Sequence, residues 1–400
     1  MSDTPSDTPT TSPDTRTDTR TGTPTSPAAS DAGPRFSPLH DVHVALGAAF
    51  TDFAGWQMPV RYSSDLAEHH AVRTAAGIFD ISHMAEIAVD GPDAAAFLDA
   101  ALAGRLSAMA PGKAKYSLVL NEQGGIVDDL IVYRLTDTSY LVVANASNRF
   151  AVVEALQQRV SMNDNTFNVA LDDRTEAIAL IAVQGPASAA VLAATPGLAI
   201  DGLNELRYYA WGSGTFAGLD LMVARTGYTG EDGFELYVPV EHAGALWAAL
   251  TVAGEPLGLV PCGLAARDTL RLEAGMPLYG HELGLNIQPV QAGLGRVVVT
   301  DKPAFVGRDA IIAGPPVDAP VLVGLRAEGR RAARAEYPIF HGDALVGEVT
   351  SGALSPTLGY PIAMAFVAPE ASALGTQLEL DVRGTRIAAT VVTVPFYSRL

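Results

Sequence analysis

The chain has 400 residues, of which 48% are hydrophobic. This is enough for a large buried core and for about two or three domains. The formal net charge is −18, and a negative surface repels phosphate backbones, which argues against nucleic-acid binding. No apolar stretch reaches the roughly 18–20 residues of a membrane helix, and the N-terminus has no secretory signal. The single cysteine, Cys262, excludes a disulfide framework within the chain. We therefore expect a cytoplasmic protein without a nucleic-acid or membrane partner.

The chain divides by composition into three parts. Residues 1–35 are almost entirely Thr, Ser, Pro, Asp, Gly and Arg, so they have nothing to bury and are predicted to be a disordered tail. Residues 36–313 mix helical and strand patterns without strict alternation, which favours an α+β fold over a doubly wound sheet. After Gly314-Pro315-Pro316, residues 317–400 form a domain of their own.

Hydrophobic periodicity predicts the elements of the large part. Helices are expected at 92–103, 149–159, 187–195, 241–252 and 263–274. Strands are expected at 115–120, 126–134, 140–145, 176–184, 219–226 and 234–240. In the C-terminal part, 321–394 reads as about six short strands separated by turns, which is typical of a small β-barrel.

The predicted strand at 126–134 holds two adjacent acids, Asp128 and Asp129. Alternation places them on opposite faces, and both faces are otherwise apolar. At least one carboxylate should therefore be largely buried, where it needs hydrogen bonds and has a raised pKa. Either a functional carboxylate or a structural pair fits this pattern.

A glycine-rich segment runs from Arg225 to Glu235 and includes Tyr228. Its glycines mark a loop that turns tightly or approaches a ligand closely. Glu235 follows where the chain re-enters a strand, and its carboxylate could accept two parallel N–H bonds from a planar ligand. An ordinary hairpin with exposed acids fits equally well.

Two arginines, Arg267 and Arg271, are four residues apart on the predicted helix at 263–274 and share a face. They either bind an anionic ligand or pair with acids. The spacing of the histidines closes no metal site, so no metal is expected. Neither a dinucleotide fingerprint nor a nucleophile elbow is present.

Several runs together resemble the glycine cleavage T-protein family over about 38–397. The resemblance is carried by Phe53-Ala54-Gly55-Trp56, Phe79-Asp80-Ile81-Ser82-His83-Met84, Asn121-Glu122-Gln123-Gly124-Gly125-Ile126-Val127-Asp128-Asp129-Leu130, Gly227-Tyr228-Thr229-Gly230-Glu231-Asp232-Gly233, Ala266-Arg267-Asp268-Thr269-Leu270-Arg271-Leu272-Glu273-Ala274-Gly275 and Pro395-Phe396-Tyr397. Each run is moderately specific, and their order strengthens the match.

The resemblance implies a folate-binding aminomethyltransferase fold: two interwoven α+β subdomains over 36–313 and the C-terminal barrel, around a tetrahydrofolate cavity. The methylene of an aminomethyl group on lipoylated H-protein would pass to tetrahydrofolate, with release of ammonia. Tetrahydrofolate would be the co-substrate, without metal, flavin or nicotinamide. The H-protein would be the direct partner, and the P- and L-proteins would be functional partners.

The resemblance also implies site residues. Asp129 matches the catalytic acid. The expected folate-binding positions are Met84, Tyr116, Tyr133, Asn145, Tyr228, Glu235, Arg267 and Tyr397.

Some features depart from the family pattern. Gln291 and Arg296 stand where the resemblance leads us to expect an acid and a tryptophan, so their loop departs from the family pattern for the cavity. The basic cluster Arg326, Arg330, Arg331 and Arg334 either steers the acidic H-protein or is a solvated turn.

Two alternative functions stay open: another folate-dependent demethylase of the same superfamily, and a non-catalytic folate-binding protein. The presence of Asp129 favours an enzyme over a non-catalytic folate-binding protein.

Overall fold

A closed barrel and two larger sheets make up the fold of residues 33–162 and 165–399, which the computed structural model describes. The tail predicted at 1–35 lies almost wholly outside the described residues. At its end, Arg35 and Phe36 form a short strand, β1 (Arg35–Phe36), which pairs in parallel with β3 (Trp56–Arg61). Residues from Pro34 onward form one compact unit.

A seven-stranded sheet has the order β13-β14-β15-β16-β12-β4-β17. Its neighbouring strands are antiparallel except for β17 and β4. The bounds are β4 (Ala76–Asp80), β12 (Ile178–Gln184), β13 (Leu198–Ile200), β14 (Trp211–Phe216), β15 (Leu219–Ala224), β16 (Gly233–Pro239) and β17 (Leu259–Pro261).

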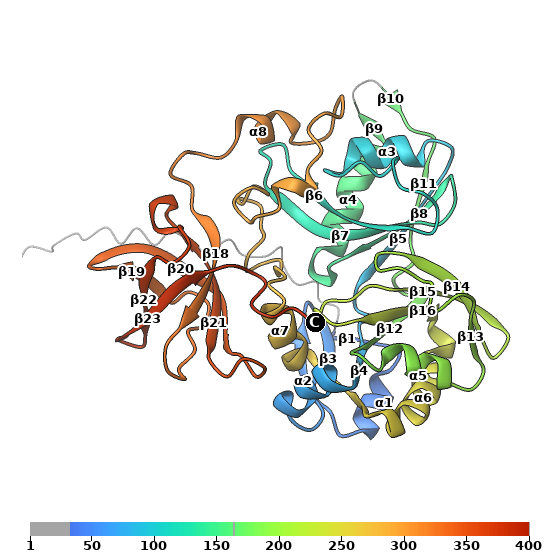
Figure 1. Cartoon of the computed structure of the whole chain (residues 1–400). Coiled ribbons are helices and arrows are strands. Elements are labelled where there is room, and N and C mark those ends of the chain that lie inside the picture. Colours follow the sequence, from blue (N-terminus) through green and yellow to red (C-terminus); the bar gives the residue numbers. More distant parts are fainter. Residues whose placement is uncertain (1–32, 163–164, 400) are drawn as a thin grey trace, which may run out of the picture. The chain divides into compact units, whose positions relative to one another are not determined.

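A five-stranded antiparallel sheet has the order β11-β5-β8-β7-β6. The bounds are β5 (Ala85–Asp90), β6 (Ala114–Leu120), β7 (Ile126–Arg134), β8 (Ser139–Ala144) and β11 (Ala170–Asp173). The chain passes from β4 in one sheet to β5 in the other and returns at β12. The two sheets are therefore interwoven in sequence, and Figure 1 shows them side by side.

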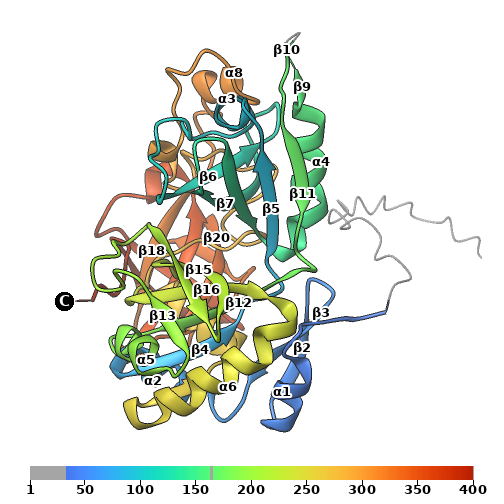
Figure 2. The same cartoon turned by 90° about the vertical axis from the view of Figure 1, so that its right-hand side faces the viewer.

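Helices cover one face of each sheet (Figure 2). The apolar faces of α5 (Ser188–Ala194) and α6 (Ala243–Gly254) pack on the seven-stranded sheet. Those of α3 (Ala94–Ala101) and α4 (Arg149–Arg159) pack on the five-stranded sheet. The uncovered faces meet in a further core cluster that includes Tyr133, Leu180 and Tyr237. This face-to-face packing brings side chains of β7 close to side chains of β12 and β16.

Four further α-helices and three further strands lie outside the barrel among the described residues. The helices are α1 (His40–Ala45), α2 (Asp65–Thr74), α7 (Leu264–Glu273) and α8 (Arg308–Ala313), and the strands are β2 (Ala49–Phe53), β9 (Ser161–Met162) and β10 (Asn165–Thr166). None of the described helices is long and apolar enough to cross a membrane.

Six strands close the C-terminal barrel in the order β18-β21-β20-β19-β22-β23. The bounds are β18 (Val321–Ala327), β19 (Pro338–His341), β20 (Ala344–Leu354), β21 (Pro361–Val367), β22 (Gln377–Val382) and β23 (Thr385–Val392). Closure leaves no free sheet edge. The mixed helix-and-strand fold class and the barrel predicted from the sequence are confirmed.

Helix α7 joins the barrel to the sheets through buried charges. Arg271 contacts Glu282 at 3.1 Å and donates to Ser351 Oγ on β20 at 2.7 Å. Glu273 accepts hydrogen bonds from Arg73 on α2 at 2.9 Å and from the backbone N–H of Thr357 in the barrel at 3.0 Å. A buried charge is tolerated only when it is paired and hydrogen-bonded in this way.

Candidate active site

A cavity of about 300 Å³ lies between the two sheets. Strands β7 and β8 form one wall, and β12 and β16 form the other. Helix α7 and the segment 275–279 that follows it complete the lining. The residues that line it are Ile81, Met84, Tyr116, Asp129, Leu130, Ile131, Tyr133, Val143, Asn145, Leu180, Tyr209, Gly227, Tyr228, Glu235, Arg267, Gly275, Met276, Pro277, Leu278, Tyr279 and Leu294. None of the described barrel residues is among them.

Asp129 stands on the β7 wall of the cavity. Its Oδ2 accepts a hydrogen bond from the Tyr116 hydroxyl at 3.0 Å, and its Oδ1 accepts one from Asn145 Nδ2 at 2.8 Å. Burial raises the pKa of its carboxyl group, although both hydrogen bonds oppose the increase. A carboxyl group with a raised pKa in a cavity is suited to hold or move a proton.

Asp128 is fully buried and does not line the cavity. The register of β6 and β7 shifts here, because Val119 pairs with Asp128 while Leu120 pairs with Ile126. The shift lies before Asp128, so the two acids still face opposite sides of the strand, as expected. Asn145 nevertheless binds both, because its Nδ2 also donates to Asp128 Oδ1 at 2.8 Å.

Glu235 stands on the opposite wall, on β16, and is only 8% exposed. Its Oε2 accepts hydrogen bonds from Thr226 Oγ1 at 2.6 Å and from the Tyr133 hydroxyl at 3.3 Å. Tyr237, two residues along the same face of β16, donates to the Tyr133 hydroxyl at 3.1 Å. Burial raises the pKa of Glu235, and the hydrogen bond from Thr226 and the charge of Arg267 oppose this. Because Oε2 already accepts two hydrogen bonds, Oε1 is the acceptor left for a ligand.

Arg267 lines the cavity from α7, with its guanidinium carbon 4.9 Å from the centre of the Tyr228 ring. Burial lowers its pKa, and the nearby Glu235 carboxylate opposes this. Arg271 lies one turn further along and pairs with acids instead. The sequence left two roles open for these arginines, ligand binding and pairing with acids. The position of Arg267 in the cavity lining fits ligand binding, and the contacts of Arg271 fit pairing with acids.

The glycine-rich segment wraps around a side chain from β12. A Cβ on Gly227 would lie 2.0 Å from Gln184 Oε1, and a Cβ on Gly233 would lie 2.3 Å from Gln184 Nε2. Gln184 also donates to the Thr226 carbonyl oxygen at 3.1 Å. The demand for glycine thus comes mainly from a close protein contact, which fixes the loop that carries Thr226 and Tyr228.

Tyr397 lies outside the cavity lining, in contrast to the other predicted binding residues. Its backbone N–H donates to the Glu273 carbonyl oxygen at 2.8 Å, and its ring centre is 4.1 Å from the Arg73 guanidinium carbon. Neither Gln291 nor Arg296 lines the cavity either. Gln291 Nε2 donates to the Pro320 carbonyl oxygen at 3.0 Å, and Arg296 is exposed. Their loop contributes Leu294 to the cavity.

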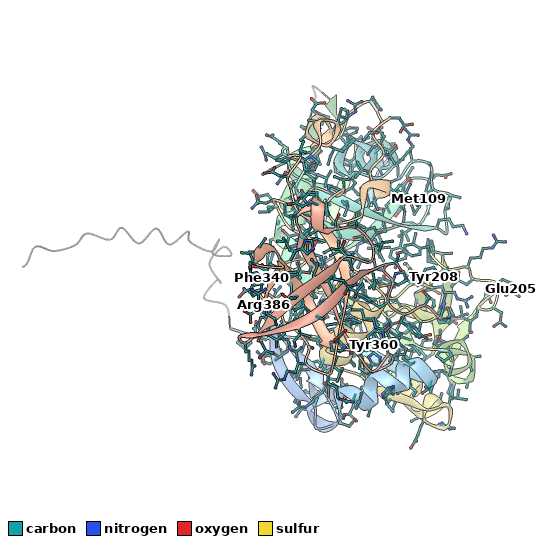
Figure 3. All side chains as sticks on the ribbon, turned by 60° about the vertical axis from the view of Figure 1, so that its left-hand side comes forward. Met109, Glu205, Tyr208, Phe340, Tyr360 and Arg386 are labelled. Carbon is teal, nitrogen blue, oxygen red and sulfur yellow. The ribbon has the colours of Figure 1, made fainter. Side chains whose placement is uncertain are left out.

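The basic cluster lies on and beside β18 of the barrel. Arg326 stacks on the ring of Tyr360, labelled in Figure 3, at 4.3 Å. Arg334 donates to the Gly352 carbonyl oxygen at 3.2 Å. All four arginines are exposed, but only Arg326 and Arg334 make such a contact with a described residue. Arg330 and Arg331 are therefore the members of the cluster whose charge is most available to a partner.

Sequence reasoning missed three residues that support the cavity: Gln184, Thr226 and Tyr237. Tyr237 could have been found, because it lies two residues from Glu235 in a predicted strand and so shares its face. Gln184 acts through contacts with a segment far from it in the sequence, and no local signal marks it. Thr226 lies within the glycine-rich segment, but no pattern shows that its hydroxyl reaches Glu235. Tyr209 also lines the cavity, with a positive φ of 58° that no pattern predicts.

Carboxyl groups on two facing walls, with an arginine and several tyrosines between apolar side chains, are typical of an enzyme that binds a small molecule. Residues 39–302 match the family model described as GCVT N-terminal domain. Residues 321–398 match the one described as glycine cleavage T-protein C-terminal barrel domain.

Full-length relatives agree with these matches. The chain is 56% identical over 371 residues to an aminomethyltransferase of Cutibacterium acnes, covering 91% of this chain and 99% of that protein. It is 54% identical over 374 residues to an aminomethyltransferase of Streptomyces coelicolor, covering 91% and 98%. The crystal structure of the glycine cleavage system aminomethyltransferase T from Bartonella henselae superimposes with a TM-score of 0.82 at 38% identity, covering 91% and 98%.

The chain therefore belongs to the glycine cleavage T-protein family, as its motifs predicted. The domain boundaries and the roles of the individual site residues stay predictions.

Proposed function

We propose that this chain transfers the methylene of an aminomethyl group carried by lipoylated H-protein to tetrahydrofolate, releasing ammonia. The aminomethyltransferase activity itself is confirmed by the full-length relatives. The observation that carries the finer proposal is that Asp129 and Glu235 line the same cavity from two different sheets. One carboxyl group is thereby available for proton transfer and the other for holding the ligand.

The Glu235 wall suits the pterin ring of tetrahydrofolate. A pterin presents a planar edge of N–H donors, and a buried carboxylate oxygen is a strong acceptor for such an edge. The Tyr228 ring and the Met84 side chain supply apolar surface in the lining. The guanidinium of Arg267, which makes no ion pair with a described residue, supplies donors to acceptor atoms of the ligand.

The wall of the cavity that carries Asp129 provides the group for proton transfer in the reaction. Two N–H protons of tetrahydrofolate are lost when the methylene bridge forms; one ends on the departing nitrogen, as ammonia, and the other on the sulfur of the dihydrolipoyl group. Asp129 is the group in our proposal that moves a proton between these atoms. The H-protein is the direct partner, the P- and L-proteins are functional partners, and the cytoplasmic location stays a prediction.

The test is an assay with aminomethylated H-protein and tetrahydrofolate, with each component omitted in turn. We expect ammonia and methylenetetrahydrofolate only in the complete mixture. Tetrahydrofolate should also raise the melting temperature, because a ligand that binds only the folded state stabilises it. Equal melting with and without saturating tetrahydrofolate, together with no turnover, would refute the proposal.

A further inference from the structure

The two neighbouring aspartates differ in what their hydrogen-bond partners can do. Asp128 accepts three bonds, all from N–H groups: the Asn145 backbone at 3.0 Å, Asn145 Nδ2 at 2.8 Å and Asn148 Nδ2 at 2.7 Å. An N–H group can only donate. A protonated Asp128 would therefore find no acceptor for its own hydrogen among these partners.

Asp129 has a partner that can reverse its role. Tyr116 places its hydroxyl 3.0 Å from Asp129 Oδ2, and a hydroxyl group can either donate or accept. If Asp129 is protonated, its O–H can donate to the Tyr116 oxygen or point into the cavity. With the two amide groups oriented in this way, a neutral Asp129 has an acceptor for its proton, and a neutral Asp128 has none among its three partners.

Both groups cannot carry a full charge without a large cost. They are adjacent in sequence, Asp128 is fully buried and Asp129 is partly buried, and one amide group, Asn145 Nδ2, bridges them at 2.8 Å to each. No arginine, lysine or histidine among the described residues bonds to either carboxyl group. The titratable groups that face the pair from neighbouring elements are Tyr116, Tyr209, Tyr228 and Tyr279, all neutral when protonated.

We propose that Asp128 and Asp129 share a single proton at neutral pH, that Asp129 carries it, and that Asp128 is the charged positioning residue that keeps it there. Burial raises the pKa of both carboxyl groups, and a negative neighbour disfavours a second charge. The hydrogen-bond partners, and not these pKa shifts, place the proton on Asp129. Asp129 then begins the reaction as an acid.

This inference rests on the proposed function and specifies the proton transfer in it. Asp129 gives its proton to one departing atom and takes one from a tetrahydrofolate N–H, so the carboxyl group ends the cycle as it began. The role of Asp128 is electrostatic, and it does not touch the reacting atoms.

The first experiment titrates the carboxylic-acid C=O stretch of the full chain by infrared spectroscopy, without substrates. The wild type is compared with Asp128→Asn, which reports Asp129 alone, and Asp129→Asn, which reports Asp128 alone. Difference spectra cancel the bands of other buried carboxyl groups such as Glu86. We expect both midpoints to fall by about one pH unit or more relative to the upper midpoint of the wild type. We also expect the midpoint of Asp129 to stay above that of Asp128.

The reverse order would place the proton on Asp128, and midpoints unchanged from the wild type would show that the two groups are uncoupled. Either result overturns the proposal. Because no substrate is needed, failure here is distinguishable from failure of the proposed function, which would appear as absent turnover.

The second experiment follows kcat against pH. In the wild type, kcat should fall as pH rises through the upper pKa of the pair, since Asp129 then loses its proton. In Asp128→Asn this alkaline limb should move to lower pH by about one unit, whereas a purely structural role would lower kcat without moving the limb. If Asp128→Asn does not fold, Asn148→Ala removes one donor that stabilises the charged form of Asp128. The limb should then stay in place or move to higher pH, because the upper pKa of the pair cannot fall while Asp128 keeps its carboxyl group. A limb that moves to lower pH in this variant would contradict the proposal.

Discussion

The hydroxyl of Tyr237 donates to the hydroxyl of Tyr133 across 3.1 Å, at the back of the cavity. The Tyr133 proton is thereby directed toward Thr226 or Glu235, the other groups within reach. A residue that lines no part of the cavity thus helps to fix which oxygen of Glu235 faces a ligand.

The first prediction concerns this hydrogen-bond chain. Tyr237→Phe should weaken tetrahydrofolate binding by about fivefold to tenfold, since a net hydrogen bond contributes about 1 kcal/mol, and should leave kcat nearly unchanged. Titration calorimetry measures the affinity. In the Glu235→Gln background the same change should have little further effect.

Tyr140→Phe is the matched control. Tyr140 is also fully buried, but its hydroxyl finds no hydrogen-bond partner among the described residues, so folate affinity should not change. Equal losses from Tyr237→Phe in the wild-type and Glu235→Gln backgrounds would show that Tyr237 does not act through Glu235.

Asp129→Asn should abolish most of the turnover. The side chains are nearly isosteric, so the fold should persist, and Glu235 and Arg267 still hold the ligand. We expect kcat to fall by roughly 100-fold or more, the usual scale for a positioned acid–base group, while KM for tetrahydrofolate changes little. Steady-state kinetics, with a thermal melt to verify folding, would settle this. A near-normal kcat would remove Asp129 from the chemistry.

Acid should unfold the protein partly through Glu273. Burial alone would raise the pKa of Glu273, but hydrogen bonds and charge from His69, with hydrogen bonds from Ser355 and Thr357, lower it to about 2. A lowered pKa means that the carboxylate stabilises the fold above its unfolded value of about 4.5, and that this contribution disappears as pH falls toward about 2.

Glu273→Gln should therefore lower the free energy of unfolding at pH 7 by about 3 kcal/mol. The difference from the wild type should shrink as pH falls below about 4.5. Urea unfolding at several pH values measures this. The same change at the exposed Glu370 should have no such effect, and a pH-independent difference at Glu273 would contradict the assignment.

Reversing the charge at Arg330 and Arg331 should test the docking hypothesis. If these exposed arginines steer the acidic H-protein, the apparent KM for H-protein should rise steeply with salt, because exposed charges act over roughly 8–10 Å at physiological ionic strength. Substituting both by Glu should raise KM at low salt and abolish the salt dependence. A salt-insensitive KM in the wild type would leave a solvated turn as the better interpretation.

Local patterns predicted the elements that carry the site better than they predicted its contacts. Alternation placed β7 at Ile126–Arg134 and periodicity placed α4 at Arg149–Arg159, as the structure has them. By the same alternation, Asp129 and Tyr133 share one face of the strand, and both line the cavity. It could not show that Asn145 bridges Asp128 and Asp129, because that contact depends on how β8 ends beside β7.

The same limit explains the glycine-rich segment. Its glycines were read as a turn or a ligand approach, yet the side chain that requires them, Gln184, lies 42 residues before the Thr226 carbonyl group that it binds. For Gln184 the sequence contains no signal of a contact that is present in the structure. For Tyr397 the family resemblance implied a position in the cavity, but the ring packs on Arg73 outside the cavity lining.

Helix α7 gives the barrel an influence on a cavity to which it contributes no lining residue. The helix presents Arg267 to the cavity, while its next turn is held by Ser351 and Thr357 of the barrel through Arg271 and Glu273. A chain shortened after residue 313 would keep all the lining residues but lose the anchors of this helix. Barrel and cavity are thus not interchangeable modules, and a barrel exchanged between relatives would have to bring matching partners for both side chains.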